Sequence, residues 1–176
     1  MSKEQMAVDR LGEDGSGPGE RAPYREEFLN TLIGSLAETI ENVVGLKDAE
    51  AFIGIVGRRM GQYEEVRLPG TVSREPADLA EHLRRFKESI GGDFRVESVE
   101  GTRIVFTNKR CPFASQVVGR PSLCMMTTNV FGRAAADATG YARVKVAEAL
   151  ARGDEKCRVI VDLERNGADD GQEFYS

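Results

Sequence analysis

Residues 102–141 read TRIVFTNKRCPFASQVVGRPSLCMMTTNVFGRAAADATGY. The first part alternates apolar and polar residues and ends near Cys111, whereas the part after Ser122 repeats apolar residues at helical three- and four-residue steps. Cys124 lies in the first turn of that helix, for which Ser122 is the expected N-cap. Cys157, the third and last cysteine of the chain, begins a later strand-like segment. This strand, loop and helix set the directions of the strands that follow.

The remaining periodic segments predict the fold class. Apolar stripes and alternating patterns predict further helices and strands. The helices are expected at about 24–44, 48–63 and 76–90, and the strands at 94–99, 103–107, 141–150 and 157–163. The order predicts an α+β domain whose N-terminal helices pack on a small, mostly antiparallel four-stranded sheet with one crossover helix.

Composition bounds the class of protein. The chain has 176 residues, 40% of them hydrophobic, which suits one domain, expected over residues 23–165. Residues 1–22 and 166–176 hold too few apolar residues to offset chain entropy, so we expect a disordered leader and tail. There is no apolar run long enough to cross a bilayer and no signal peptide. We therefore expect a cytoplasmic protein that does not insert into a membrane. The net charge of −5 argues against direct nucleic-acid binding.

Three glycines lie within the second predicted helix, at positions 54, 57 and 61. Each costs about 1 kcal/mol relative to alanine, so something must compensate. A dinucleotide-binding turn would need a preceding strand and the GxGxxG spacing, and both are missing here. A ligand or backbone lying close to the helix is one explanation. Tight contact with another helix is the commoner reason and our expectation.

Chain direction predicts that the three cysteines converge. A helix of about 17 residues carries the chain roughly 25 Å, back to the opposite end of the sheet. The strand after it then runs parallel to the strand before Cys111, and the last predicted strand is antiparallel to both. Cys111, Cys124 and Cys157 should therefore meet at one end of the sheet.

The chemistry expected at that end is metal or cluster binding. The helix start at Cys124 and the nearby Arg110, Arg120 and Arg158 would lower the thiol pKa values if the arginines pointed inward. Three thiolates can then bind a soft ion and leave one position open. An iron–sulfur cluster of the 4Fe–4S type with one other ligand, or zinc with water or His82, would fit.

Other roles for these residues remain open. Two cysteines could form a redox-switch disulfide, one could be a nucleophile, or all three could be ordinary buried residues. His82 is the single histidine of the chain and lies at the edge of a predicted buried face. A histidine in that position is more often a packing residue than a ligand.

Several motifs resemble a known family, the methanogen output domain, a relative of the 4-vinyl reductase domain. The resemblance covers about residues 25–163, and its motifs are CPF at 111–113, PSLCMMT at 121–127, NVFG at 129–132, ARGD at 151–154 and CRV at 157–159. It implies the α+β ligand-binding fold shared by haem-based nitric-oxide sensors and a trafficking-complex subunit. Such domains usually sense a small molecule or redox state and pass the signal to a partner.

The resemblance leads to three functional hypotheses. The first is a non-catalytic cytoplasmic sensor whose cysteines hold an iron–sulfur cluster or zinc; we expect no haem, because the Tyr-x-Ser-x-Arg haem signature is missing. The second is an enzyme, since cysteine-bearing thiazoline carboxylate hydrolases are somewhat similar and Cys124 could be their nucleophile. The third is an interaction module whose first two helices form a homodimer face. No helix-turn-helix or kinase segment is evident, so we expect output through a second copy or another protein partner.

Overall fold

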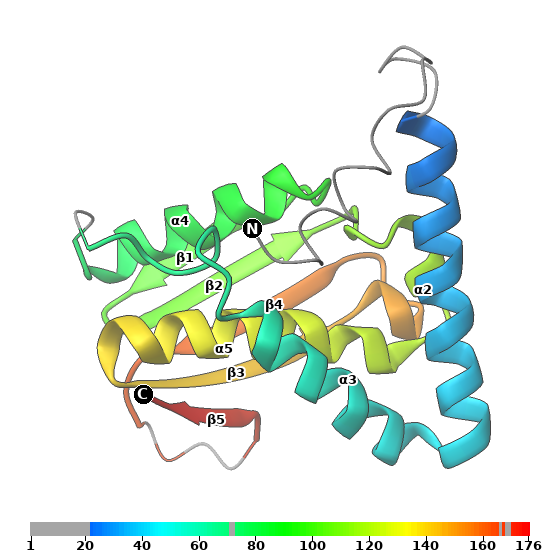
Figure 1. The fold of residues 1–176 in the computed structure, drawn as a ribbon. Helices are drawn as coiled ribbons and strands as arrows, with labels where there is room; N and C mark the ends of the chain where they lie inside the picture. The colour runs from blue at the N-terminus through cyan, green and yellow to red at the C-terminus, as the bar shows by residue number, and fades with distance from the viewer. Residues whose placement is uncertain (1–21, 71–72, 166, 168–169) are drawn as a thin grey trace, which may run out of the picture.

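The computed structural model describes residues 22–70, 73–165, 167 and 170–176, and its main elements follow the predicted order (Figure 1). The helices are α2 (Ala22–Val44), α3 (Leu46–Met60), α4 (Pro76–Ser89) and α5 (Cys124–Thr139). The strands are β1 (Arg95–Glu100), β2 (Arg103–Asn108), β3 (Tyr141–Glu148), β4 (Cys157–Asp162) and β5 (Gln172–Tyr175). Short 3-10 helices are η1 (Ala114–Val117), η2 (Pro121–Leu123) and η3 (Leu150–Arg152).

The strands form one antiparallel sheet in the order β1-β2-β4-β3-β5. Both β2 and β3 pair antiparallel with β4, so they run in the same direction, as predicted from the crossover through α5. The register places Asn108, at the end of β2, opposite Cys157, at the start of β4. The α+β class is therefore confirmed, with β4 inserted between the two strands that the crossover joins.

The sheet has five strands instead of the expected four. β5 lies within the segment expected to be a disordered tail, and it pairs with the edge strand β3. Phe174 anchors β5, because its ring is buried against α5 where Gly132 leaves space: a Cβ on that glycine would lie 2.1 Å from the ring. A single apolar anchor in a polar segment leaves too little periodicity to detect. The expected leader lies outside the described residues apart from Ala22, which begins α2.

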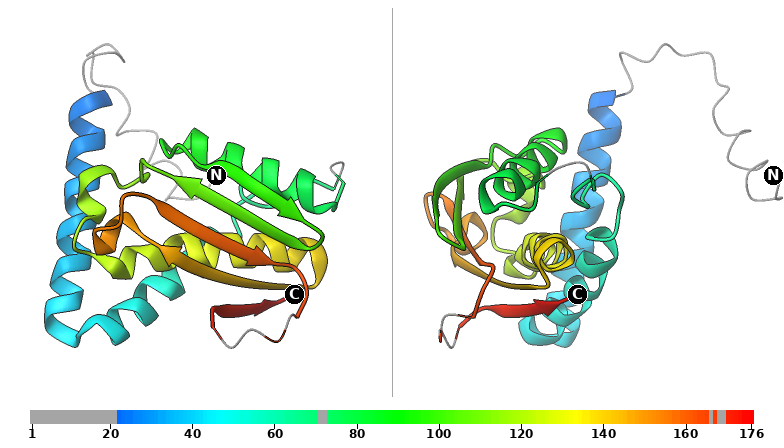
Figure 2. Two further views of the ribbon diagram at one scale, coloured as in Figure 1. Left: turned by 180° about the vertical axis from the view of Figure 1, so that it is seen from behind. Right: turned by 90° about the vertical axis from the view of Figure 1, so that its left-hand side faces the viewer.

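Helices cover one face of the sheet, with α4 and α5 against the strands and α3 outside α5 (Figures 1 and 2). The largest fully buried side chains between these layers include Phe106, Phe131, Leu79, Leu83 and Ile104. At one end of the sheet, α2 stands beside the loop that follows β2 (Figure 2). The core is therefore continuous from the sheet through α5 and α4, and α2 closes its end.

The glycines of α3 lie against α5. A Cβ at Gly57 would lie 2.8 Å from the Cβ of Asn129 and 3.1 Å from the carbonyl oxygen of Met125. A Cβ at Gly61 would lie 2.8 Å from the Cβ of Arg133. Close helix packing is therefore why α3 carries glycines, as the sequence predicted.

Candidate functional site

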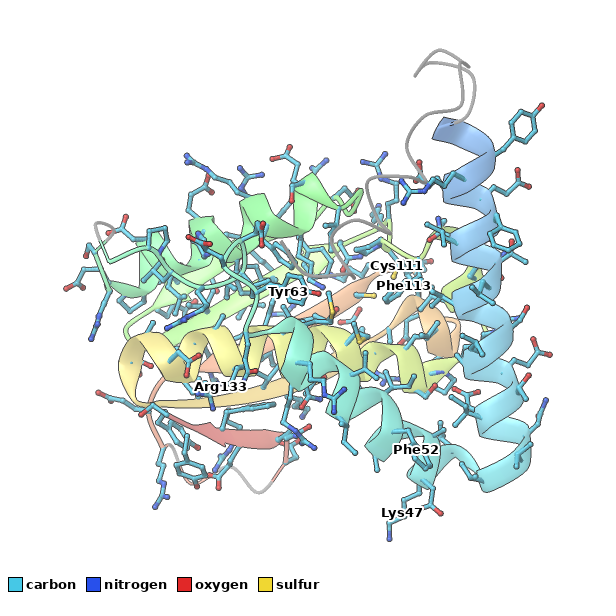
Figure 3. All side chains as sticks on the ribbon, in the orientation of Figure 1. Lys47, Phe52, Tyr63, Cys111, Phe113 and Arg133 are labelled. Carbon is cyan, nitrogen blue, oxygen red and sulfur yellow. The ribbon has the colours of Figure 1, made fainter. Side chains whose placement is uncertain are left out.

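The three cysteines line one small cavity of about 20 Å³ at the end of the sheet. Cys111 comes from the loop after β2, Cys124 is the first residue of α5, and Cys157 is the first residue of β4. Figure 3 shows Cys111 and Phe113 in the space between α2, α4 and α5. The other lining residues are Phe94, Asn108, Phe113, Val117, Leu123, Thr127, Val146 and Val159. The predicted convergence of the cysteines is therefore present.

Backbone hydrogen bonds hold the Cys111 loop in place. Asp93 Oδ1 accepts from the backbone N–H groups of Lys109 at 3.0 Å and Arg110 at 2.7 Å. The carbonyl oxygen of Cys111 accepts from the N–H of Ala114 at 2.9 Å. The loop therefore turns directly after β2 and returns Cys111 toward the start of β4.

The backbone N–H of Leu150 and the side chain of Asn108 lie near Cys157. The Sγ atom accepts a hydrogen bond from the backbone N–H of Leu150 at 3.4 Å, and Asn108 lies opposite Cys157 in the register of β2 and β4. Asn108 is 3% exposed, and its Nδ2 donates to the carbonyl oxygen of Arg110 at 3.1 Å. Its Oδ1 is buried and has no hydrogen-bond partner among the described residues. The cavity wall thus offers one unused acceptor.

The condition for depressed thiol pKa values is not met, because Arg110, Arg120 and Arg158 do not line the cavity. Burial raises the pKa of Cys111, Cys124 and Cys157, and that of Cys124 reaches about 12 because the other two thiols add to the effect of desolvation. The three thiols are therefore neutral in the ion-free protein at neutral pH.

The nearby arginines are engaged with other groups. Arg110 donates to the carbonyl oxygen of Gly91 at 3.1 Å, and Arg120 pairs with Glu38. Arg158 pairs with Glu97 at 2.8 Å, and none of the three lines the cavity. Adjacency in sequence did not bring these cations to the sulfurs.

Lys87 of α4 is a buried cation that the structure brings to the thiols, and the more exposed Arg152 also acts on Cys124 and Cys157. Lys87 is 4% exposed, its Nζ donates to Thr127 Oγ1 at 3.0 Å, and it lies 5.3 Å from the ring centroids of both Phe94 and Phe131. Burial lowers the pKa of Lys87 from 10.5 to about 8, opposed by the three cysteines. Sequence reasoning missed it, although Lys87 continues the four-residue steps of the buried Leu79 and Leu83.

His82 occupies a different place. Its Nε2 lies 2.9 Å from the carbonyl oxygen of Val66, in the connection before α4, and it does not line the thiol cavity. The structure therefore does not bring His82 to the cysteines, and its environment is that of a partly buried packing residue.

The helix start at Cys124 also differs from the expected cap. Leu123 holds the N-cap position, and no side chain caps the helix. The backbone N–H of Ser122 donates to Glu41 Oε1 at 2.9 Å, while Ser122 Oγ is buried with no partner among the described residues. Pro121 opens η2, and this 3-10 turn runs directly into α5, so the helix begins without the predicted serine cap.

Comparison with protein families agrees with this fold and its motifs. Residues 32–162 match the model of methanogen output domain 1. The chain belongs to this family. No curated protein matches the sequence of this output domain.

Solved structures that resemble the output domain include a trafficking subunit and a sensory domain. A trafficking protein particle complex subunit 3 from Naegleria fowleri, covalently bound to palmitic acid, is 15% identical; the match covers 81% of this chain and 97% of that chain with a TM-score of 0.58. The phenol-responsive sensory domain of the transcription activator PoxR, solved with phenol, is 12% identical; the match covers 76% of this chain and 73% of that chain with a TM-score of 0.47. The first likeness shows that the output domain shares the fold of the trafficking subunit.

The cavity of the output domain brings together sulfur atoms that could bind a metal ion, but these atoms do not form a complete set of metal ligands. Within the part of the chain that the structure describes, no group of three or more His, Cys, Asp and Glu side chains is arranged to hold a metal ion. The three cysteines are free thiols. What the site offers is three soft donors, one buried cation and one unused acceptor around a water-sized space.

The outer faces of α2 and α3 carry exposed apolar side chains. The large apolar side chains that are 38% or more exposed on these two helices are Tyr24, Phe28, Leu29, Leu32, Leu36, Val43, Val44, Leu46, Phe52, Ile55 and Val56. Figure 3 labels Phe52 on α3. Among the described helices, none has the length and apolar character needed to cross a bilayer. An exposed apolar surface of this kind typically marks an interaction site.

Proposed function

We propose that this output domain is a sensory or regulatory module that receives its signal at the thiol cavity, and that the signal is occupancy by one soft metal ion. The observation that carries the proposal is the meeting of Cys111, Cys124 and Cys157, from three separate elements, around a single space. Thiolates favour ions such as zinc, and a bound ion would draw their protons off in spite of the raised pKa values.

The size of the cavity favours a single ion over a cluster. A space of about 20 Å³ accommodates roughly one water molecule. A 4Fe–4S cluster contains several metal and sulfide atoms and would require the walls to move apart.

The surroundings of the cavity suggest how occupancy would be transmitted. Ile33 and Ala37 of α2 belong to the same apolar cluster as the three cysteines. Cys124 begins α5, which in turn packs against the glycines of α3. Drawing the three sulfurs together would therefore shift the supports of both α2 and α3, whose outer faces are apolar and exposed.

Other activities find less support in the geometry. A cysteine hydrolase needs a reactive thiolate, whereas the pKa of Cys124 is about 12 and no histidine lines the cavity. The trafficking subunit carries a covalent palmitic acid, but a cavity of about 20 Å³ has no room for an acyl chain. The ion is the occupant that matches the available space.

Metal content of the purified protein tests the proposal. Full-length protein is prepared without oxygen, loaded with zinc or cobalt, and analysed by elemental analysis and absorption spectroscopy. We expect about one ion per chain, a sulfur-to-cobalt charge-transfer band, and loss of both in Cys111→Ser, Cys124→Ser and Cys157→Ser. The exposed Val118→Ser, in the same loop as Cys111, serves as the control and should retain the ion.

Three outcomes would contradict this proposal. A wild-type protein that binds no ion removes it, and so does one whose cysteine variants bind as well as the wild type. A brown protein containing iron and inorganic sulfide would replace the single ion by a cluster at the same thiols.

A further inference from the structure

A second pocket, called here the outer pocket, lies at the edge of the sheet and has only polar and charged lining residues. It measures about 260 Å³ and is lined by Asp93, Arg95, Thr107, Asn108, Lys109 and Lys156. These residues belong to β1, to β2 and to the segments next to the ends of β1, β2 and β4. Asn108 also lines the thiol cavity, so it is a wall that the two spaces share.

Strand pairing explains why the charged residues of the outer pocket lie together. Arg95 lies directly opposite Thr107 in the pairing of β1 with β2. Lys109 and Lys156 each lie one residue beyond the last pair of β2 with β4, so they are next to each other. Because side chains alternate between the two faces of a sheet, all four are directed to the face opposite the one on which Phe106 is buried. No helix covers that face, which the left view of Figure 2 shows from the front.

The three cations of the outer pocket have no acidic partner among the described residues. The ion pairs of this part of the chain include none of Arg95, Lys109 and Lys156. Like charges on neighbouring strands repel each other and destabilise the pairing. Asp93 is the one acid in the lining, and its Oδ1 accepts from two backbone N–H groups. Three cations and one acid leave an excess of positive charge, in a chain whose net charge is −5.

The charged residues next to the outer pocket do not line it and largely cancel one another. Arg110 and Glu155, the sequence neighbours of Lys109 and Lys156, are both exposed and opposite in charge. Further charges on β1, on β4 and at residues 152–154 form two ion pairs, which are Arg158 with Glu97 at 2.8 Å and Arg152 with Asp154 at 4.0 Å. The excess of positive charge therefore belongs to the pocket itself.

We propose that the outer pocket binds the phosphate group of a small soluble molecule. Arg95 offers the planar N–H donors that suit a phosphate, the two lysines offer ammonium groups, and Thr107 adds a hydroxyl. A phosphate monoester carries about −1.5 to −2 charges at neutral pH, which matches the excess positive charge better than a single carboxylate does. The volume of about 260 Å³ is close to the lower limit of roughly 300 Å³ for small-molecule sites. This second site goes beyond the proposed function and does not depend on what occupies the thiol cavity.

Binding of glycerol 3-phosphate to the full-length protein tests the proposal. Isothermal titration calorimetry of the wild type should show one site per chain, with an affinity that falls as the salt concentration rises. We expect Arg95→Gln to weaken binding about 10-fold or more, because it removes a charged hydrogen-bond donor, and the double variant Lys109→Gln, Lys156→Gln to do the same. The exposed Lys47→Gln, on α3, is the matched control and should bind like the wild type.

Asp93→Asn separates recognition of charge from maintenance of the fold. The Oδ1 atom of asparagine can still accept from the backbone N–H groups of Lys109 and Arg110, while the negative charge in the pocket is removed. We expect glycerol 3-phosphate to bind about 2- to 5-fold more tightly, the effect of one exposed charge pair. A purely structural role of these residues would give no such gain.

Four results would overturn the proposal. They are a wild type that does not bind glycerol 3-phosphate, equal weakening in Lys47→Gln and Arg95→Gln, tighter binding of malonate than of glycerol 3-phosphate, and binding to vesicles containing phosphatidic acid without binding to glycerol 3-phosphate. The third result would assign the pocket to a carboxylate ligand, and the fourth would assign its charges to a lipid surface. None of these measurements concerns metal content, so this proposal and the proposed function stand or fall separately.

Discussion

The Lys87 side chain shows how a single buried residue can oppose folding. Its pKa is about 8 in the folded ion-free protein against an ordinary 10.5, so the unfolded chain binds this proton more tightly. The charged Lys87 therefore destabilises the fold below pH 8. The penalty decreases as the pH rises from about 8 to 10.5 and is absent above that range, and the two pKa values correspond to about 3 kcal/mol.

Lys87→Met should therefore stabilise the ion-free protein at neutral pH. We expect the free energy of unfolding to rise by about 1–2 kcal/mol, because the lost Thr127 bond and ring contacts offset part of the relief. The difference between variant and wild type should shrink between about pH 8 and 10.5. Urea denaturation with a chelator and a reducing agent, repeated across this range, measures it. A difference that does not change with pH would contradict the account.

Most helices and strands of the domain could be predicted from the sequence, whereas one strand and the order of the strands in the sheet could not. The helical stripes, the strands β1 to β4, the crossover and the glycine contact all follow from local periodicity and chain direction, and these were predicted. β5 was not, because it depends on one buried ring, and the insertion of β4 depends on pairing between distant strands. The thiol pKa values are raised, because the three arginines are engaged elsewhere and burial, which the spacing of residues does not report, outweighs the helix start.

Gly57→Ala tests the contact between α3 and α5. Alanine would gain about 1 kcal/mol of helix propensity, but its Cβ would lie 2.8 Å from the Cβ of Asn129 and 3.1 Å from a backbone oxygen. Since backbone cannot move aside cheaply, we expect a net loss of about 1–3 kcal/mol in the free energy of unfolding. Gly70→Ala, where a Cβ would meet no atom within 4 Å, is the matched control and should change little. Equal stability of the two variants would show that α3 and α5 can separate without cost.

In the whole molecule, α2 connects the thiol cavity to the exposed apolar surface on the outer faces of α2 and α3. Ile33 and Ala37 pack with the cysteines, while Phe28, Leu32 and Leu36 follow four-residue steps along a neighbouring, exposed face of the same helix. Phe52 extends the apolar surface onto α3. A change at the cavity would therefore reach this surface through a single rigid element, which is the arrangement expected of a module that passes its signal to a partner.

The apolar surface of α2 and α3 predicts self-association of the full-length protein. We expect a dimer at micromolar concentration, because exposed apolar area of this extent is typical of interfaces, and the same face on two copies is self-complementary about a two-fold axis. Leu32→Lys combined with Phe52→Lys should shift the equilibrium to monomer while circular dichroism remains unchanged. Ile90→Lys, which charges an exposed apolar position after α4, should leave the dimer intact. Analytical ultracentrifugation decides: a monomeric wild type would mean that this surface is reserved for a different protein, and loss of the dimer in Ile90→Lys would place the interface elsewhere.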